Sequence, residues 1–196
     1  MLELWSILST TQQLKQEVMK SATGVMKSMP RLTILIAAMM FASLVALAQT
    51  QTFTSDKVDY RLELPSATWR VVAEPDVSHQ HAEFIYGDRN DGHLRIRKDM
   101  LESGLTVSEF ARRDQEQKVR FLPGYIDGKE ERFSGRLNGV TISFEYTAAG
   151  KPMEGRTYYL QADSHTIYAL RFTGSRDKLA RIRNQTDLIA RSFQVK

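Results

Sequence analysis

The chain has 196 residues, of which 42% are hydrophobic and 26% are charged, as in an ordinary globular protein. Cysteine is absent, so disulfide bonds, thiolate metal sites, cysteine nucleophiles and a lipid-anchoring cysteine are excluded. The net charge is +4, but the part after residue 48 holds 23 basic and 21 acidic residues, so its near balance gives no indication of nucleic-acid binding.

A targeting segment is predicted at residues 29–48. Arg31 precedes an uncharged apolar run, and Ala46-Leu47-Ala48 has the small-x-small pattern of a signal-peptidase site. The run is shorter than the roughly 20 residues of a membrane-spanning helix. We therefore expect export to the periplasm or the exterior, with cleavage after Ala48. The alternative is an uncleaved N-terminal anchor with the domain outside.

The segments on either side of this leader are assigned from their composition. Residues 1–28 form an upstream extension, too long and too mixed for the n-region of a signal peptide. Translation from Met26 or Met29, rather than from Met1, is a hypothesis that N-terminal sequencing of the precursor tests. The remaining assignments are a polar linker at 49–54 and one domain at 55–196, long enough to bury a core.

The domain opens with strands. Pro65 ends the first of them, and the polar sequence GDRNDG at 87–92 predicts a turn that places Tyr86 opposite His93. Alternating apolar and polar residues predict these strands over 58–64, 69–72, 82–86 and 94–97.

A helix is predicted over 107–121. Thr106 and Glu109 fit a capping box, in which each side chain satisfies a free backbone amide at the helix start. Pro123-Gly124 then stops the helix.

Four more strands and a final helix follow. Asn138-Gly139 is taken as a turn and AAGKPMEG, 148–155, as a loop. Ser175 opens the helix, whose apolar residues recur at helical spacing as far as Phe193. The strands are predicted over 126–134, 140–146, 157–160 and 167–172, the last apolar on both faces and therefore central. Hairpin-length turns favour an α+β fold with a mainly antiparallel sheet sandwiched by helices.

Four segments in this order resemble the PsbP-like domain family, which includes a photosystem II accessory protein and bacterial envelope proteins of the DcrB type. The segments are RLELPSATWRV at 61–71, LNGVTISFEYT at 137–147, GRTYYLQADSHTIYALRFTGS at 155–175 and DLIARSF at 187–193. Thr68 departs from the family, where a glycine is frequent. The resemblance implies an α/β/α sandwich that acts as a non-enzymatic binding or assembly factor, without a cofactor.

Candidate reactive groups are few. His79 and His81 share a strand face and could meet one metal ion, but His93 is expected about 16 Å further along, so exposed histidines are the preferred interpretation. Asp163, Ser164 and His165 are adjacent, which is the wrong geometry for a catalytic triad.

The carboxylates and glycines give no clearer site. Glu130 and Glu131 point to opposite faces of their strand. Asp88, Asn90 and Asp91 do not have the spacing of a calcium loop. Gly135 and Gly139 are interpreted as turn residues, and no nucleotide-binding motif is present. No catalytic, metal or cofactor residue is therefore assigned.

A contact surface is assigned instead, to Lys151, Pro152 and Met153 in the predicted loop and to Arg112 and Arg113 on the predicted basic helix face. The helix face is either solvated or a docking surface for an acidic envelope partner or anionic lipid headgroups. The leading hypothesis is an exported factor that docks on an envelope protein, without nucleic acid. The alternatives are a carrier with an apolar pocket above roughly 300 Å³ and, less favoured, a hydrolase.

Overall fold

The computed structural model describes residues 50–76 and 81–196. The upstream extension, the targeting segment and His79 lie outside the described residues. Within the described residues, no helix combines the length and the hydropathy that crossing a membrane requires.

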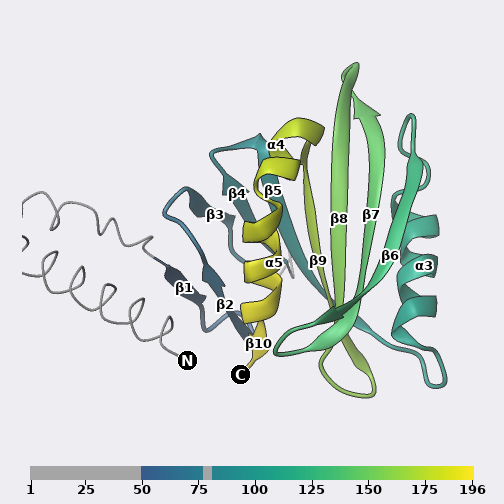
Figure 1. Ribbon diagram of the computed structural model, residues 1–196. Coiled ribbons are helices and arrows are strands. Elements are labelled where there is room, and N and C mark those ends of the chain that lie inside the picture. Colours follow the sequence, from purple (N-terminus) through teal and green to yellow (C-terminus); the bar gives the residue numbers. More distant parts are fainter. Residues whose placement is uncertain (1–49, 77–80) are drawn as a thin grey trace, which may run out of the picture. The chain divides into compact units, whose positions relative to one another are not determined.

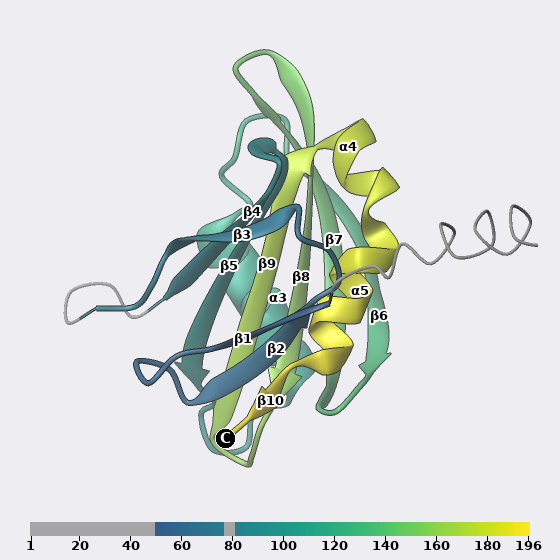
Figure 2. The same ribbon diagram turned by 90° about the vertical axis from the view of Figure 1, so that its left-hand side faces the viewer.

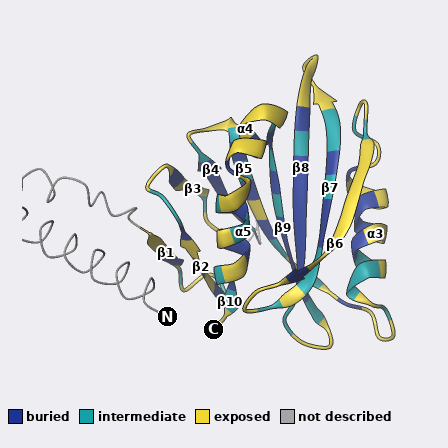
Figure 3. Cartoon of the chain, viewed as in Figure 1, coloured by how far each residue is buried: buried dark blue, intermediate teal, exposed yellow. Residues whose placement is uncertain are grey.

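A seven-stranded antiparallel sheet is the centre of the domain (Figure 1). Its strand order is β3-β4-β5-β9-β8-β7-β6. The bounds are β3 (Trp69–Ala73), β4 (Ala82–Tyr86), β5 (Asp88–Met100), β6 (Ile126–Ser134), β7 (Asn138–Ala148), β8 (Lys151–Gln161) and β9 (Thr166–Ser175). Most residues of β4, β8 and β9 are buried, whereas the edge strand β6 is exposed (Figure 3).

One face of this sheet carries the main core. A three-stranded sheet of β1 (Gln51–Thr54), β2 (Tyr60–Leu64) and β10 (Gln194–Val195) lies over it, together with α4 (Arg176–Arg181) and α5 (Arg183–Ser192), as Figure 2 shows. Aromatic rings from both layers interlock here: Tyr60 lies 4.9 Å from Phe193 and 5.8 Å from Tyr168 between ring centroids. These contacts bury the apolar half of each alternating strand.

The other face carries α3 (Val107–Lys118), which packs on β7 and β8. The predicted capping box is confirmed, because Glu109 N–H donates to the Thr106 hydroxyl while the Glu109 carboxylate accepts from Thr106 N–H. A small apolar cluster, including Ala111, Ile142 and Tyr159, lies beneath the helix.

The predicted fold class is confirmed, but some boundaries are wrong. Residues 51–54, assigned to the linker, form β1, and β10 was not predicted. The first helix ends at Lys118, which leaves Phe121 73% exposed. The last helix breaks at Ile182 into α4 and α5. β1 and β10 are too short, and the helix break at Ile182 too small, to change the hydrophobic periodicity of the sequence.

The predicted turn at Asn138-Gly139 and the predicted loop at 148–155 are both wrong, because these residues lie largely within β7 and β8. Gly139 lies within β7, where a Cβ would stand 1.8 Å from the carbonyl oxygen of Tyr159, so glycine allows close strand approach rather than a turn. The loop at 148–155 is a hairpin turning on Ala149 and Gly150, both with positive φ. Pro152 is tolerated in β8 because the pairing of β8 with β9 begins only at Met153.

Candidate functional site

The α3-bearing face of the large sheet is covered over only half its width. Helix α3 contacts β7 and β8, while β4, β5 and the adjoining half of β9 lie beyond it. Alternation along β5 places Leu94 and Ile96 in the core, so His93, Arg95 and Arg97 project from the uncovered face. The sheet therefore presents charged side chains where a second helix would otherwise bury apolar ones.

A cleft of about 480 Å³ opens on this uncovered half. It is lined by His81, His93, Arg95, Arg97, Lys118, Ala169, Arg171 and Thr173. The β5–β9 register pairs Arg97 with Ala169, Arg95 with Arg171 and His93 with Thr173, so the floor of the cleft follows two neighbouring strands.

Asp114 of α3 anchors one wall of the cleft. Its side chain is only 2% exposed, and it accepts hydrogen bonds from Arg97 (2.7 Å) and Arg171 (2.8 Å) and pairs with Lys118 (2.8 Å). The Tyr159 hydroxyl also donates to it, at 2.8 Å. Burial raises the pKa of Asp114, but the Lys118 hydrogen bond and the two guanidinium charges outweigh burial and hold that pKa below its ordinary value.

Glu83 of β4 anchors the opposite wall. Arg95 donates to one carboxylate oxygen through Nε (3.1 Å) and Nη2 (2.9 Å), and His93 Nε2 lies 2.9 Å from the other. Arg89 lies 3.4 Å away, and His81 Nε2 3.3 Å away. Burial opposes the charged form of Glu83, but the His93 hydrogen bond and the Arg95 charge lower its pKa to about 2.

His93 and His81 therefore meet at one carboxylate, although the sequence placed them about 16 Å apart along the strand. The predicted register was wrong: Ile85, not Tyr86, lies opposite His93, and a bulge takes up residues 89–92. Burial and the nearby Arg89 and Arg95 lower the pKa of His93 more than Glu83 raises it. No group of three metal-ligating side chains is found in the described part of the chain.

The cleft carries a surplus of positive charge. Five basic side chains form ion pairs with only three carboxylates. The basic residues are Arg89, Arg95, Arg97, Lys118 and Arg171, and the acidic ones are Glu83, Asp99 and Asp114. Two positive charges are left over while both histidines are neutral. A concave, partly desolvated surface of this sign favours anionic ligands.

Two other cavities are also lined by charged groups. One of about 450 Å³ includes three aspartates and two lysines: Asp56, Asp59, Asp76, Lys57 and Lys98. Another, of about 270 Å³, lies between α3 and β6 and contains two arginines and three carboxylates. These cavities exceed or approach the size predicted for a carrier, but charged side chains share their linings with apolar ones such as Tyr60 and Ile96.

The contact residues assigned from the sequence lie on separate elements. Lys151 and Pro152 are exposed beside the β7–β8 turn, whereas Met153 is buried. Arg112 pairs with Glu130 of β6 at 2.8 Å, and Arg113 pairs with Glu102 at 3.0 Å.

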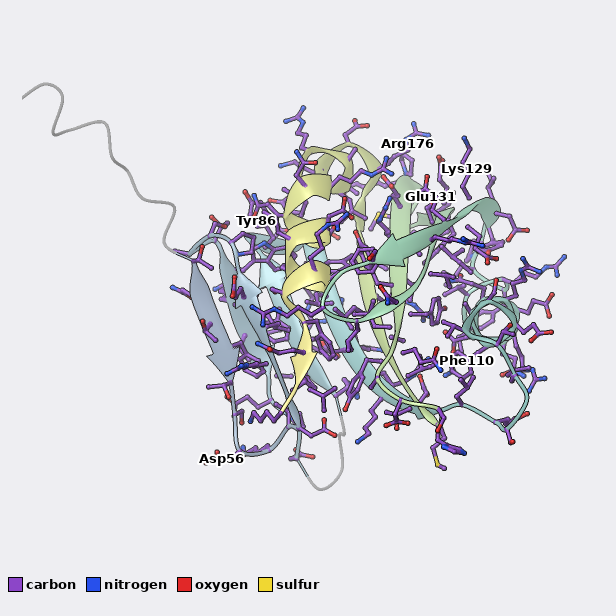
Figure 4. The ribbon with its side chains drawn as sticks, turned by 60° about the horizontal axis from the view of Figure 1, so that its bottom comes forward. Asp56, Tyr86, Phe110, Lys129, Glu131 and Arg176 are labelled. Atoms are coloured by element: carbon purple, nitrogen blue, oxygen red, sulfur yellow. The ribbon has the colours of Figure 1, made fainter. Side chains whose placement is uncertain are left out.

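The weaker sequence candidates are explained by local bonding. Ser164 contacts the His165 ring at 2.7 Å, but Asp163 accepts from the backbone of His165 and does not orient the ring. Glu130 faces α3, where it bonds Arg112, and Glu131 faces Arg183 of α5, as predicted for strand neighbours (Figure 4 labels Lys129 and Glu131 on β6 and Phe110 on α3).

Asp88, Asn90 and Asp91, considered above for calcium binding, form local hydrogen bonds that explain their positions. Its Oδ1 accepts hydrogen bonds from the backbone amides of Asn90 and Asp91, at 2.7 and 3.1 Å. Asp91 also pairs with Lys178 of α4, at 3.2 Å. The Asp88 and Asp91 carboxylates therefore stabilise the bulge at the start of β5.

Solved structures, but no curated sequences, are similar to this chain. No protein-family model matches the chain, and neither does any curated protein sequence. The solution structure of PsbP (CyanoP) from Synechocystis sp. PCC 6803 superposes with a TM-score of 0.57 at 14% identity, over 78% of this chain and 96% of that one. The chain has a PsbP-like fold. The resemblance predicted from the four sequence segments is thereby confirmed at the level of the fold.

Two further solved structures share this fold and come from other organisms. LpqN of Mycobacterium tuberculosis, a protein involved in cell envelope biogenesis, has a TM-score of 0.53 at 14% identity, over 79% of this chain and 96% of its own. The Ran-binding protein Mog1p of Saccharomyces cerevisiae has a TM-score of 0.54 at 7% identity, over 76% of this chain and 96% of its own. At such identities the shared fold does not transfer a site.

Proposed function

We propose that this protein is an exported, non-enzymatic binding or assembly factor of the cell envelope, and that it docks on another envelope protein through the basic cleft. The observation that carries the proposal is the half-covered sheet face, where Arg95, Arg97 and Arg171 line a 480 Å³ opening. A positive cleft takes an acidic segment of a partner, because complementary charge steers encounter and sets orientation.

Three further observations support a docking role. The charged groups of the cleft bond one another and are not arranged as a nucleophile, a base and an orienting acid. The PsbP-like neighbours include LpqN, which is involved in envelope biogenesis, and Mog1p, which binds Ran. The apolar run and the small-x-small pattern at 29–48 fit a targeting segment whose predicted cleavage after Ala48 would release the domain outside the cytoplasm.

The β7–β8 turn is proposed as a second contact. Lys151 and Pro152 stand exposed beside a turn that extends past the end of β9, so a partner can reach them. Arg112 and Arg113 on α3 are proposed as a further contact with the partner or with anionic headgroups, with less support because both are paired to carboxylates.

Photo-crosslinking in the native host tests the proposal. A photoreactive phenylalanine analogue is placed at Thr173 in the cleft, at Lys151 beside the turn, or at Arg61 on the three-stranded sheet as a control. We expect Thr173 to crosslink an envelope protein at an acidic segment identified by mass spectrometry, with the yield reduced by Arg95→Gln. Equal yields at Thr173 and Arg61 would contradict docking through the cleft.

Localisation is tested separately on the same strain. Fractionation is expected to find the protein outside the cytoplasm, and N-terminal sequencing of the mature form is expected to begin at Gln49. A mature protein that retains residues 29–48 would favour the anchored alternative.

A further inference from the structure

Three arginines crowd together on the two central strands of the cleft. Arg95 of β5 lies directly opposite Arg171 of β9, and Arg97 follows two residues along on the same face. Like charges at directly opposed positions destabilise a sheet. Their juxtaposition therefore needs compensation by anions.

The protein's own carboxylates compensate these arginines only in part. Each arginine donates through Nε and Nη2. Arg95 donates from both atoms to Glu83. Arg97 donates to Asp99 from Nε and to Asp114 from Nη2, and Arg171 donates to Thr157 from Nε and to Asp114 from Nη2. Among the described residues, no protein group accepts from Nη1 of any of the three. Each guanidinium thus has at least the two N–H donors of Nη1 without an acceptor in this part of the chain, and these can face a ligand.

The shape of the cleft indicates an extended occupant rather than a single small ion. Its floor runs from the Arg97–Ala169 pair through Arg95–Arg171 to the His93–Thr173 pair. These four residue steps correspond to roughly 13 Å along a strand. That length matches a short stretch of extended polypeptide lying along the cleft.

The charge of the walls indicates carboxylates as the bound groups. Glu83 and Asp114 flank the arginines, so a doubly charged phosphate would be repelled by both walls. A singly charged carboxylate meets less repulsion, and it matches the planar fork of a guanidinium.

We infer that Arg95, Arg97 and Arg171 form a carboxylate-binding subsite for an acidic polypeptide segment, and that Glu83 is its internal competitor. The inference rests on the proposed docking function and names the partner's chemistry. Glu83 holds the Arg95 fork and His93 in the free protein. An incoming carboxylate must share or replace those bonds, so Glu83 sets a threshold that weakly acidic segments do not pass.

The experiment measures binding of fluorescein-labelled hexaglutamate to the purified protein by fluorescence anisotropy at low salt, with hexaglutamine as the neutral probe. We expect Arg95→Gln to weaken binding about tenfold, and Glu83→Gln to tighten it about fivefold, because Arg95 is half exposed in the cleft and the buried Glu83 competes for its guanidinium. The controls Arg61→Gln and Glu63→Gln make the same charge changes on the three-stranded sheet and should alter affinity less than about twofold.

The double variant Glu83→Gln/Arg95→Gln separates competition from a general charge effect. Competition for Arg95 predicts that Glu83→Gln loses its benefit once Arg95 is absent, so the two effects are not additive. Circular dichroism and thermal unfolding confirm that each variant folds. Unchanged binding in folded Arg95→Gln, weaker binding in folded Glu83→Gln, or additive effects would overturn the inference.

This result is distinguishable from failure of the proposed function. If hexaglutamate does not bind but Thr173 crosslinks an envelope protein, the carboxylate subsite is refuted and docking stands. If hexaglutamate binds as expected but no envelope protein crosslinks from the cleft, docking on an envelope protein is refuted and the subsite chemistry stands.

Discussion

Replacing Asp114 by asparagine should destabilise the domain strongly, because this carboxylate joins α3 to two strands of the sheet. Three cations and the Tyr159 hydroxyl converge on a side chain that is 2% exposed. Removing one partner of a buried ion pair costs roughly 3–5 kcal/mol. The three cations remain 20–41% exposed and can regain water, so we expect the lower end, about 3 kcal/mol.

Thermal and urea unfolding at pH 7 measure this loss. About 3 kcal/mol corresponds to a fall in Tm of about 10 °C for a domain of this size. The matched control is Glu102→Gln, which breaks an exposed pair with Arg113 and should cost less than about 0.5 kcal/mol.

The pH dependence gives a second readout of the same group. Because the folded pKa of Asp114 lies below its unfolded value of about 3.9, its stabilisation is present above pH 4 and is lost as the pH falls through the folded pKa. The gap in unfolding free energy between wild type and Asp114→Asn should therefore close below about pH 4. A loss under about 1 kcal/mol at pH 7, or a gap that widens in acid, would refute the reasoning.

Three other predictions concern the same face of the sheet. The pKa of Glu83 is lowered to about 2, so Glu83→Gln should lower the free energy of unfolding by its full amount above pH 4.5. This loss, measured by urea unfolding, should disappear as the pH approaches 2. A loss that stays constant with pH would contradict the prediction. Acidification from pH 7.5 to 5.5 should tighten hexaglutamate binding by up to about threefold, mostly at the acid end, because the pKa of His93 lies below its ordinary value and the ring gains charge only there; His93→Gln should reduce this gain, and an equal gain in both proteins would exclude His93 as a contributor. A Cβ at Gly155 would stand 2.0 Å from the buried Phe144 ring, so Gly155→Ala should lower the unfolding free energy by roughly 1–3 kcal/mol, and an unchanged Tm would contradict the packing.

The sequence predicted the fold where its signal is local and periodic. The strands over 140–146 and 167–172 and the capping box at Thr106 each appear as predicted, because the apolar faces of a strand and the satisfied start of a helix depend on residue spacing within a short segment. The order of those segments also sufficed for the PsbP-like resemblance. The turn predicted at Gly139 is wrong, because the sequence does not distinguish a glycine needed for a turn from a glycine that lets the carbonyl of a neighbouring strand approach closely.

The cleft was not predicted, although parts of its signal were visible. Arg95 and Arg97 alternate with apolar residues along β5, and Asp114 interrupts a basic stretch of α3. What could not be seen was which cation each carboxylate would meet, since Glu83 with Arg95 and Asp114 with Arg171 are brought together by strand register and helix placement.

The amino-acid sequence by itself determined a helix-covered antiparallel sheet, because the burial of alternating apolar side chains depends on residue type and spacing. Only the tertiary structure decided that α3 covers half of one face and leaves three arginines in an open cleft. The physical reason is that electrostatic pairing acts through space between strands and helices far apart in the chain, and no local pattern records it.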